Sequence, residues 1–179
     1  MARRWIGSAL GLAAVAGALV FAFTGGLAGA GDDEPGAGAG GMPQAQKKID
    51  HPLAKAIVGT WEIATKSEFG DANGTVKFAL GVGDTAILQD YESTGAMGPY
   101  AGHGIWKFSD DGKSLHLWWI DVRSAGPHDY AGTLTDTGYD LKTADDGTRI
   151  TLAKTEAGFE FKLYGPDGKL FFTDTYTKK

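Results

Sequence analysis

The chain of 179 residues contains no cysteine. This absence excludes disulfide bonds, thiolate zinc sites, a thiol nucleophile and the lipid-modified cysteine of a lipoprotein. A domain of this kind that works outside the cell must therefore be stable through packing alone. Hydrophobic residues make up 42% of the sequence and aromatic residues 11%, which is enough to build a core.

Acidic residues outnumber basic ones beyond the N-terminus. All 22 acidic residues follow position 31, whereas Arg3 and Arg4 precede it. The region after position 31 therefore carries 15 basic against 22 acidic residues, a formal charge of −7. Because nucleic acids and anionic membrane surfaces are bound by basic faces, we expect neither as a partner of the folded domain.

Residues 1–30 have the pattern of a signal peptide. Arg3 and Arg4 form a basic start, the stretch from Ile6 to Phe23 is strongly apolar, and residues 28–30 are Ala-Gly-Ala, a small-x-small site. We expect cleavage after Ala30 and export to the periplasm or the medium. The alternative is an uncleaved N-terminal membrane anchor, since the uncharged run is long enough for a span of ~20 residues. Its many Gly and Ala residues disfavour that alternative.

Residues 31–50 are rich in Gly, Ala and Pro and predict a flexible linker. The folded domain then covers residues 51–179, close to the commonest domain size.

The domain opens with one helical turn. Asp50 is placed to cap it and Pro52 suits its first turn. Gly59 is expected to end it. Leu53, Ala56 and Ile57 fall on one face at helical spacing.

Beyond residue 59 the chain shows no further helical period, only short strands separated by turn signals. Sequential hairpins at this spacing indicate a meander, and closing it removes both exposed edges. The sequence therefore predicts an all-β fold: a closed antiparallel up-and-down β-barrel of the lipocalin or calycin kind, with about ten short strands and one short N-terminal helical turn. The predicted strands are 60–67, 74–82, 85–93, 99–109, 114–123, 128–135, 138–144, 148–155, 158–164 and 169–177.

Two Asp-Gly turns fix the faces of two hairpins, because this dipeptide favours a two-residue type I′ turn. The turn at residues 110–113 pairs 106 with 117 and 102 with 121. The turn at 166–169 pairs 161 with 174 and 159 with 176. The inward faces then carry Trp106, Phe108, Leu115, Leu117, Trp119, Phe159, Phe161, Leu163, Phe172 and Tyr176, with Asp121 and Asp174 as unexpected inward carboxylates. Gly102 and Gly104 leave room for the large side chains opposite.

These elements resemble a bacterial family of exported lipocalin-like proteins catalogued as domain of unknown function 1579. The resemblance covers most of residues 51–179 and rests on segments 51–62, 102–104, 119–121, 164–169 and 176–179. Gly59-Thr-Trp61 also looks like the Gly-x-Trp of lipocalins, whose Trp packs across the closed end of the barrel. The resemblance implies a calycin-type barrel and no assigned activity. Some lipocalin-like proteins bind haem through a His near the C-terminus; here the last His is His128, so we expect no cofactor.

Catalytic and metal-binding patterns are missing. No Ser stands in a G-x-S-x-G elbow, which disfavours a serine hydrolase. His103 and His116 share a face, but the hairpin register separates them by four positions, on the order of 13 Å. Joint ligation needs about 2 Å from each to one ion, so we expect no metal site. An enzymatic activity is disfavoured.

The two inward carboxylates have two interpretations. A buried carboxylate must be paired, hydrogen-bonded or protonated. The favoured interpretation is a structural network that closes one barrel end, with Arg123 on the strand of Asp121. The other is a polar end to an apolar pocket, or an acid/base pair as in glycoside hydrolysis. The candidate pocket lining is Trp106, Trp119, Asp121, Arg123, Phe161, Asp174 and Tyr176.

Two functional classes remain open. The first is a binder of a small apolar or amphipathic molecule inside the barrel. The second is a filled structural or protein-interaction module, whose outward Ile105, Trp118 and Ile120 would contact a partner. A cavity of roughly several hundred Å³ would favour the first class. Nothing in the sequence specifies an oligomeric state.

Overall fold

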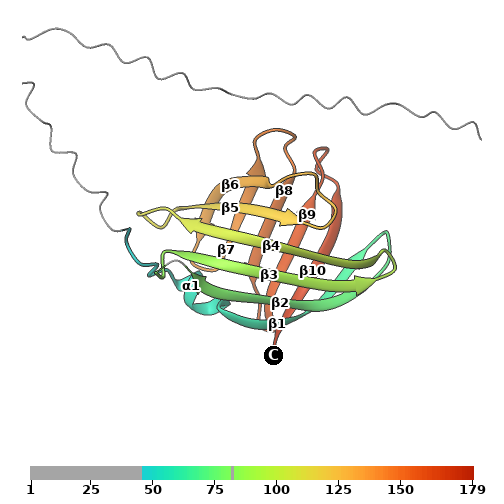
Figure 1. Ribbon diagram of the computed structural model, residues 1–179, viewed down its shortest axis with the longest axis horizontal. Coiled ribbons are helices and arrows are strands. Elements are labelled where there is room, and N and C mark those ends of the chain that lie inside the picture. The colour runs from blue at the N-terminus through green and yellow to red at the C-terminus, as the bar shows by residue number, and fades with distance from the viewer. Residues whose placement is uncertain (1–45, 82) are drawn as a thin grey trace, which may run out of the picture. The chain divides into compact units, whose positions relative to one another are not determined.

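A computed structural model describes residues 46–81 and 83–179 (Figure 1). The predicted signal peptide and the linker up to residue 45 lie outside the described residues. The elements are the helix α1 (Pro52–Ile57) and the strands β1 (Gly59–Ser67), β2 (Ala72–Gly81), β3 (Ala86–Gly95), β4 (Gly98–Phe108), β5 (Ser114–Asp121), β6 (His128–Thr135), β7 (Gly138–Thr143), β8 (Arg149–Lys154), β9 (Gly158–Tyr164) and β10 (Leu170–Lys178).

The strands form a closed antiparallel barrel. Each strand pairs with its neighbours along the chain, and β1 pairs with β10 to complete the ring. This confirms the predicted up-and-down barrel of ten strands and one short helix. Every predicted strand agrees with an observed one to within two residues at each end.

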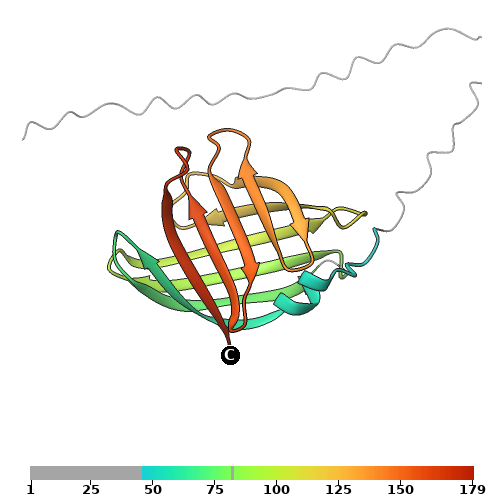
Figure 2. The same cartoon turned by 180° about the vertical axis from the view of Figure 1, so that it is seen from behind.

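The helix α1 lies at the barrel end where β1 begins and β10 finishes (Figures 1 and 2). The expected cap is wrong: His51, not Asp50, is the N-cap residue, and its Nδ1 accepts a hydrogen bond from the Leu53 N–H at 3.2 Å. Asp50 instead forms an exposed ion pair with Lys55. The helix ends on Val58 rather than on Gly59, which already starts β1. Its buried residues are Leu53, Ala54 and Ile57, with Ala56 half-buried beside them.

Both turn-derived registers are confirmed. Trp106 pairs with Leu117 and Gly102 with Asp121. On the second hairpin Phe161 pairs with Asp174 and Phe159 with Tyr176. The space attributed to Gly102 is real, because a Cβ there would lie 2.2 Å from the Trp119 ring. A side chain at this position would therefore force that ring to shift.

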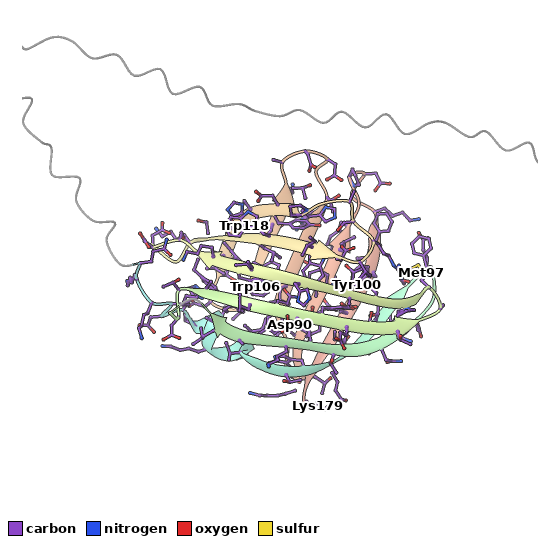
Figure 3. The ribbon with its side chains drawn as sticks, viewed as in Figure 1. Asp90, Met97, Tyr100, Trp106, Trp118 and Lys179 are labelled. Atoms are coloured by element: carbon purple, nitrogen blue, oxygen red, sulfur yellow. The ribbon has the colours of Figure 1, made fainter. Side chains whose placement is uncertain are left out.

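The interior next to α1, which we call the closed half, is tightly packed. Trp61 meets Phe159 edge to face with ring centroids 5.2 Å apart, and its indole N–H donates to the Ile57 carbonyl at 2.7 Å. Trp106 meets both Phe78 and Tyr139 edge to face at 5.2 Å. Such ring pairs fill space and add to the energy of burial. Figure 3 labels Trp106, which is buried, and Trp118, which is on the outer face.

Candidate functional site

The end of the barrel opposite α1 carries a hollow of about 350 Å³, which we call the mouth. The direction of the strands brings together the loops at residues 68–71, 96–97, 122–127, 144–148 and 165–169 at this end. The mouth is lined mainly by apolar groups from β1, β2, β3, β4, β9 and β10 and from the loops beside them. The residues used below are Thr65, Phe69, Tyr91, Ser93, Met97, Tyr100, Arg123, Leu163, Phe171 and Phe172.

The rim of the mouth exposes large apolar side chains. Phe69, Met97 and Phe171 are all exposed, and Phe69 stacks on Phe171 with ring centroids 6.3 Å apart. Figure 3 shows Met97 and Tyr100 near this end of the barrel. Exposed apolar groups that surround a concavity are typical of a binding site rather than of ordinary surface.

A smaller cavity of about 60 Å³ lies inside the barrel. Tyr91, Tyr100, Leu163 and Phe172 line both this inner cavity and the mouth. The mouth therefore narrows through a ring of mainly aromatic side chains toward the centre of the barrel.

Asp174 lines the inner cavity, beneath the mouth. The residue is 0% exposed; its Oδ1 accepts from the Thr65 hydroxyl at 2.6 Å and its Oδ2 from the Tyr91 hydroxyl at 3.1 Å. Burial raises the pKa of Asp174 to about 6, although both hydrogen bonds act to lower it. Both donors also line the mouth. A molecule that enters the mouth thus meets the hydrogen-bond partners of this carboxyl group.

Two further hydroxyl groups face the inner cavity. Tyr176 is 2% exposed and Tyr139 is 5% exposed, and both line the cavity. Among the described residues neither hydroxyl makes a hydrogen bond, and no enclosed side-chain oxygen or nitrogen is left unsatisfied there, so both hydroxyls open onto the cavity. Burial raises the pKa of both phenols, and the charge of Asp174 raises each further, so they stay neutral. A phenol hydroxyl that opens onto a cavity can donate one hydrogen bond to a molecule there and accept another from it.

The structure brings together several candidate residues and separates others. Trp119, Phe161, Asp174 and Tyr176 line the inner cavity, and Arg123 lines the mouth. Trp106 lies instead in the packed interior, where its indole N–H donates to the Gln89 side-chain oxygen at 2.8 Å.

Asp121 lies at the rim, half-buried, and lines neither hollow. Its carboxylate accepts from the backbone N–H groups of Arg123 and Ser124 at 2.8 and 2.9 Å and from the Trp119 indole at 3.0 Å. Burial acts to raise the pKa of Asp121, but the hydrogen bonds from Arg123, Trp119 and Ser124 outweigh it, and the pKa is lowered. The carboxylate therefore organises the turn after β5.

The sequence led us to expect Arg123 on the strand of Asp121, and this prediction is wrong. The strand β5 ends at Asp121, because the carboxylate captures the next backbone N–H groups and turns the chain. The guanidinium of Arg123 lies 5.3 Å from the centroid of the Tyr100 ring, and its Nη2 donates to the Met97 carbonyl at 3.0 Å.

Sequence reasoning missed Thr65, Tyr91, Tyr100 and Tyr139. Tyr91 pairs with Gly102, so its inward direction follows once the first hairpin register is extended across residues 96–97. Thr65 pairs with Asp174 across the β1–β10 closure. No turn joins these two strands, and no local signal fixes their register.

Other site types find no support. Among the described residues, no group of three or more His, Asp or Glu side chains is arranged to hold a metal ion. Within residues 46–81 and 83–179, no helix has the length and apolar character needed to cross a membrane.

Comparisons with known proteins leave the site to be interpreted from its own residues. No family model matches the chain, and no curated protein matches it. Among solved structures, it is similar to a redesigned β-barrel, mFAP1, bound to DFHBI, with 17% identity over 71% of this chain and 99% of that chain and a TM-score of 0.43. It is also similar to EF1p2_mFAP2b bound to DFHBI, with 14% identity over 72% and 98% of the two chains and a TM-score of 0.41.

Proposed function

We propose that this protein binds a small amphipathic molecule in the mouth of its barrel. The observation that carries the proposal is an apolar hollow of about 350 Å³ that adjoins an inner cavity lined by a buried carboxyl group. A mostly apolar concavity with a few converging polar groups is the usual form of a small-molecule site. The volume is at the small end of the range of roughly 300–1,000 Å³ for such sites.

The distribution of space supports binding over a filled barrel. Around Trp61 and Trp106 the rings touch edge to face and the side chains are almost completely buried. Tyr91 and Tyr100 also meet edge to face, but Tyr100 is only half-buried and both rings line a hollow. A purely structural barrel gains nothing from this hollow, because unfilled space in a core is destabilising.

We further propose that the protein is exported, with cleavage after Ala30, and that it belongs to the lipocalin-like family named above. The basic start, the apolar stretch and the Ala-Gly-Ala site support export. Intact-mass measurement of the protein recovered from the producing cell tests this. A mature chain that begins at Gly31 is expected, and a full-length species confined to membranes would favour the anchor.

Binding in the mouth is tested with the fluorescent apolar probe N-phenyl-1-naphthylamine. Ser93 lines the mouth, whereas its neighbour Thr94 is exposed and points the other way along β3. We expect Ser93→Trp to fill the mouth and weaken probe binding at least tenfold, and Thr94→Trp to leave it unchanged. Equal binding by both variants, with matching thermal melts, would show that the probe lies elsewhere.

The second candidate function is the protein-interaction module expected from the sequence. Ile105, Trp118 and Ile120 are indeed exposed on the outer face of β4 and β5, where Ile105 pairs directly with Trp118. A Trp118→Lys variant separates the candidates. It should leave probe binding in the mouth intact, whereas a probe that adheres to the outer face would be released.

A further inference from the structure

The inner end of the mouth has acceptor groups and negative charge but no positive charge. No lysine, arginine or histidine is among the described residues that line the inner cavity. Asp174 is held by two neutral hydroxyls, those of Thr65 and Tyr91, and by no cation in the described part of the chain. A carboxylate has about four acceptor positions, so about two remain open.

The neighbouring phenol groups add to this acceptor set. The hydroxyls of Tyr139 and Tyr176 have no protein partner among the described residues, and both feel the charge of Asp174. Each phenol oxygen accepts a hydrogen bond as well as donating one. Together the carboxylate and the phenols form a set that complements a group with several N–H donors.

Aromatic rings surround the route to Asp174. Tyr91 lies edge to face with Tyr100 at 5.7 Å and with Trp119 at 6.2 Å between ring centroids. Aromatic faces attract cations, most strongly where water is excluded. The aromatic rings and the Asp174 carboxylate therefore both favour a positively charged group on the ligand.

We propose that the mouth selects amphiphiles that carry a primary ammonium group, which enters first and pairs with Asp174. This inference rests on the proposed function and names the class of molecule bound. The apolar body of the guest then lies against Phe172 and the exposed rim, and the ammonium group replaces the missing cation beside the carboxylate. An anionic head would meet Asp174 with no compensating charge and is excluded.

The size of the inner cavity limits which ammonium groups can enter it. Its volume of about 60 Å³ is about twice the roughly 30 Å³ of one water molecule in the liquid, so it accommodates only a small group of a few heavy atoms. A primary ammonium group is of this size, whereas a trimethylammonium group is several times larger. We therefore expect primary amines to bind and quaternary amines of the same body to bind weakly.

Protonation of Asp174 should weaken amine binding. The groups that face it are Thr65 from β1, Tyr91 from β3, Tyr139 from β7 and Tyr176 from β10, and the three phenols stay neutral because burial raises their pKa. Of the two charged residues that line the mouth, Arg123 is turned onto Tyr100 and Met97, and Asp71 is paired with Lys66. With the pKa of Asp174 at about 6, about a tenth of the protein carries the carboxylate at pH 5.

The test is calorimetric titration of the protein with three probes that share one body: 4-phenylbutylamine, 4-phenylbutan-1-ol and 4-phenylbutyrate. At pH 7.5 we expect the amine to bind at least tenfold more tightly than the alcohol, and the acid to bind most weakly. At pH 5 the advantage of the amine should fall about tenfold, as the carboxylate is protonated. The trimethylammonium form of the amine should bind at least tenfold more weakly than the primary amine.

Two variants test whether the preference for the amine depends on Asp174. Asp174→Asn should reduce the advantage of the amine to less than threefold while binding of the alcohol is kept, which shows that the mouth is intact. Asp90→Asn removes the same charge from the outer face beside Tyr91 and should change nothing. An unchanged amine preference in Asp174→Asn would overturn the inference.

The remaining outcomes separate the inference from the proposed function. Equal binding of all three probes, or tighter binding of the acid, overturns the choice of an amine and leaves ligand binding in place. Binding of N-phenyl-1-naphthylamine without binding of the amine also overturns the inference alone. Failure of every probe to bind overturns both.

Discussion

The closed half of this barrel and the half around the mouth, which we call the open half, are both rich in aromatic residues, but these residues pack differently in each. In the closed half, Trp61, Trp106 and Phe159 are packed edge to face and are almost completely buried. In the open half, Tyr100 and Trp119 are half-buried and line space instead of filling it. Aromatic composition therefore does not determine whether a barrel is filled.

The difference between the halves comes from what covers each end. The helix α1 places Leu53 and Ile57 in the core, and the Ile57 carbonyl accepts from the Trp61 indole. The opposite end has loops that expose Phe69 and Met97. One short helix thus accounts for the packed half, and the absence of such a plug among the described residues leaves the mouth accessible.

The halves also differ in how their polar groups are paired. In the closed half, the indole N–H groups of Trp61 and Trp106 each have a protein acceptor. In the open half, a buried carboxyl group has only neutral donors, and two phenols have no partner among the described residues. The closed half therefore contributes stability, whereas the open half keeps a buried carboxyl group that has no charged partner among the described residues.

The largest effect is expected in the closed half. Trp61→Ala should lower the free energy of unfolding by about 3–5 kcal/mol, the usual range for removal of a buried large aromatic side chain. Trp61 is 4% exposed, whereas Trp118 on the outer face is 37% exposed. Urea denaturation of both alanine variants measures the contrast, and Trp118→Ala should cost less than about 1 kcal/mol. Equal losses of unfolding free energy in the two variants would contradict the contrast between the packed interior and the outer face.

Asp174→Asn should change the free energy of unfolding less than Trp61→Ala does, and near neutral pH it should raise this free energy rather than lower it. The pKa of Asp174 is raised from 3.8 to about 6, so its contribution to stability is fully present below pH 3.8 and is lost as the pH rises through 6. Asparagine stays neutral. The free energy of unfolding of the variant relative to wild type should therefore rise by about 2 kcal/mol between pH 4 and pH 8, most of the roughly 3 kcal/mol that 1.36 kcal/mol per pKa unit gives for the whole shift.

Denaturation of wild type and Asp174→Asn in parallel across this pH range measures that difference. Subtraction of one protein from the other cancels the carboxylates they share. A difference that stays flat with pH would mean that the carboxylate is already compensated in the unliganded protein.

The smallest effect is expected at the rim. Asp121→Asn removes a charge that accepts from two backbone N–H groups and the Trp119 indole, and should cost about 1 kcal/mol at pH 7 after allowance for solvent screening. Because the pKa of Asp121 is lowered, its contribution is present above pH 3.8 and is lost as the pH falls below that value. Thermal melts at pH 7 and pH 3 check the size and the sign, and Asp90→Asn serves as the exposed control. No change at pH 7 would show that the turn after β5 does not depend on the carboxylate.

The sequence predicted the parts of the fold that are set by local chemistry. The Asp-Gly turns at residues 111–112 and 167–168 have short, known geometry, so the partners of Trp106 and Asp174 within their hairpins followed from counting. The candidates Asp174, Tyr176, Phe161 and Trp119 came from these two registers, and all four line the inner cavity.

What the sequence did not predict depends on long-range closure and on side-chain competition. The contact between Thr65 and Asp174 joins strands from opposite ends of the domain, and no turn fixes that register. Trp106 has the same parity as Trp119 but lies nearer to α1, where the core is packed. His51 replaced Asp50 as the helix cap because its ring nitrogen reaches the Leu53 N–H.

The central claim is that the closed half is packed and that a ligand binds in the open half. The most direct test is a ¹⁵N–¹H spectrum that follows the tryptophan indole N–H signals while 4-phenylbutan-1-ol is added. Trp119 lines the inner cavity, and its indole N–H donates to Asp121 and to the Tyr100 hydroxyl, so its signal should shift strongly. Those of Trp61 and Trp106 in the closed half, and of Trp118 on the outer face, should stay in place. Shifts confined to Trp118, or shifts of Trp61 and Trp106 without Trp119, would contradict the account.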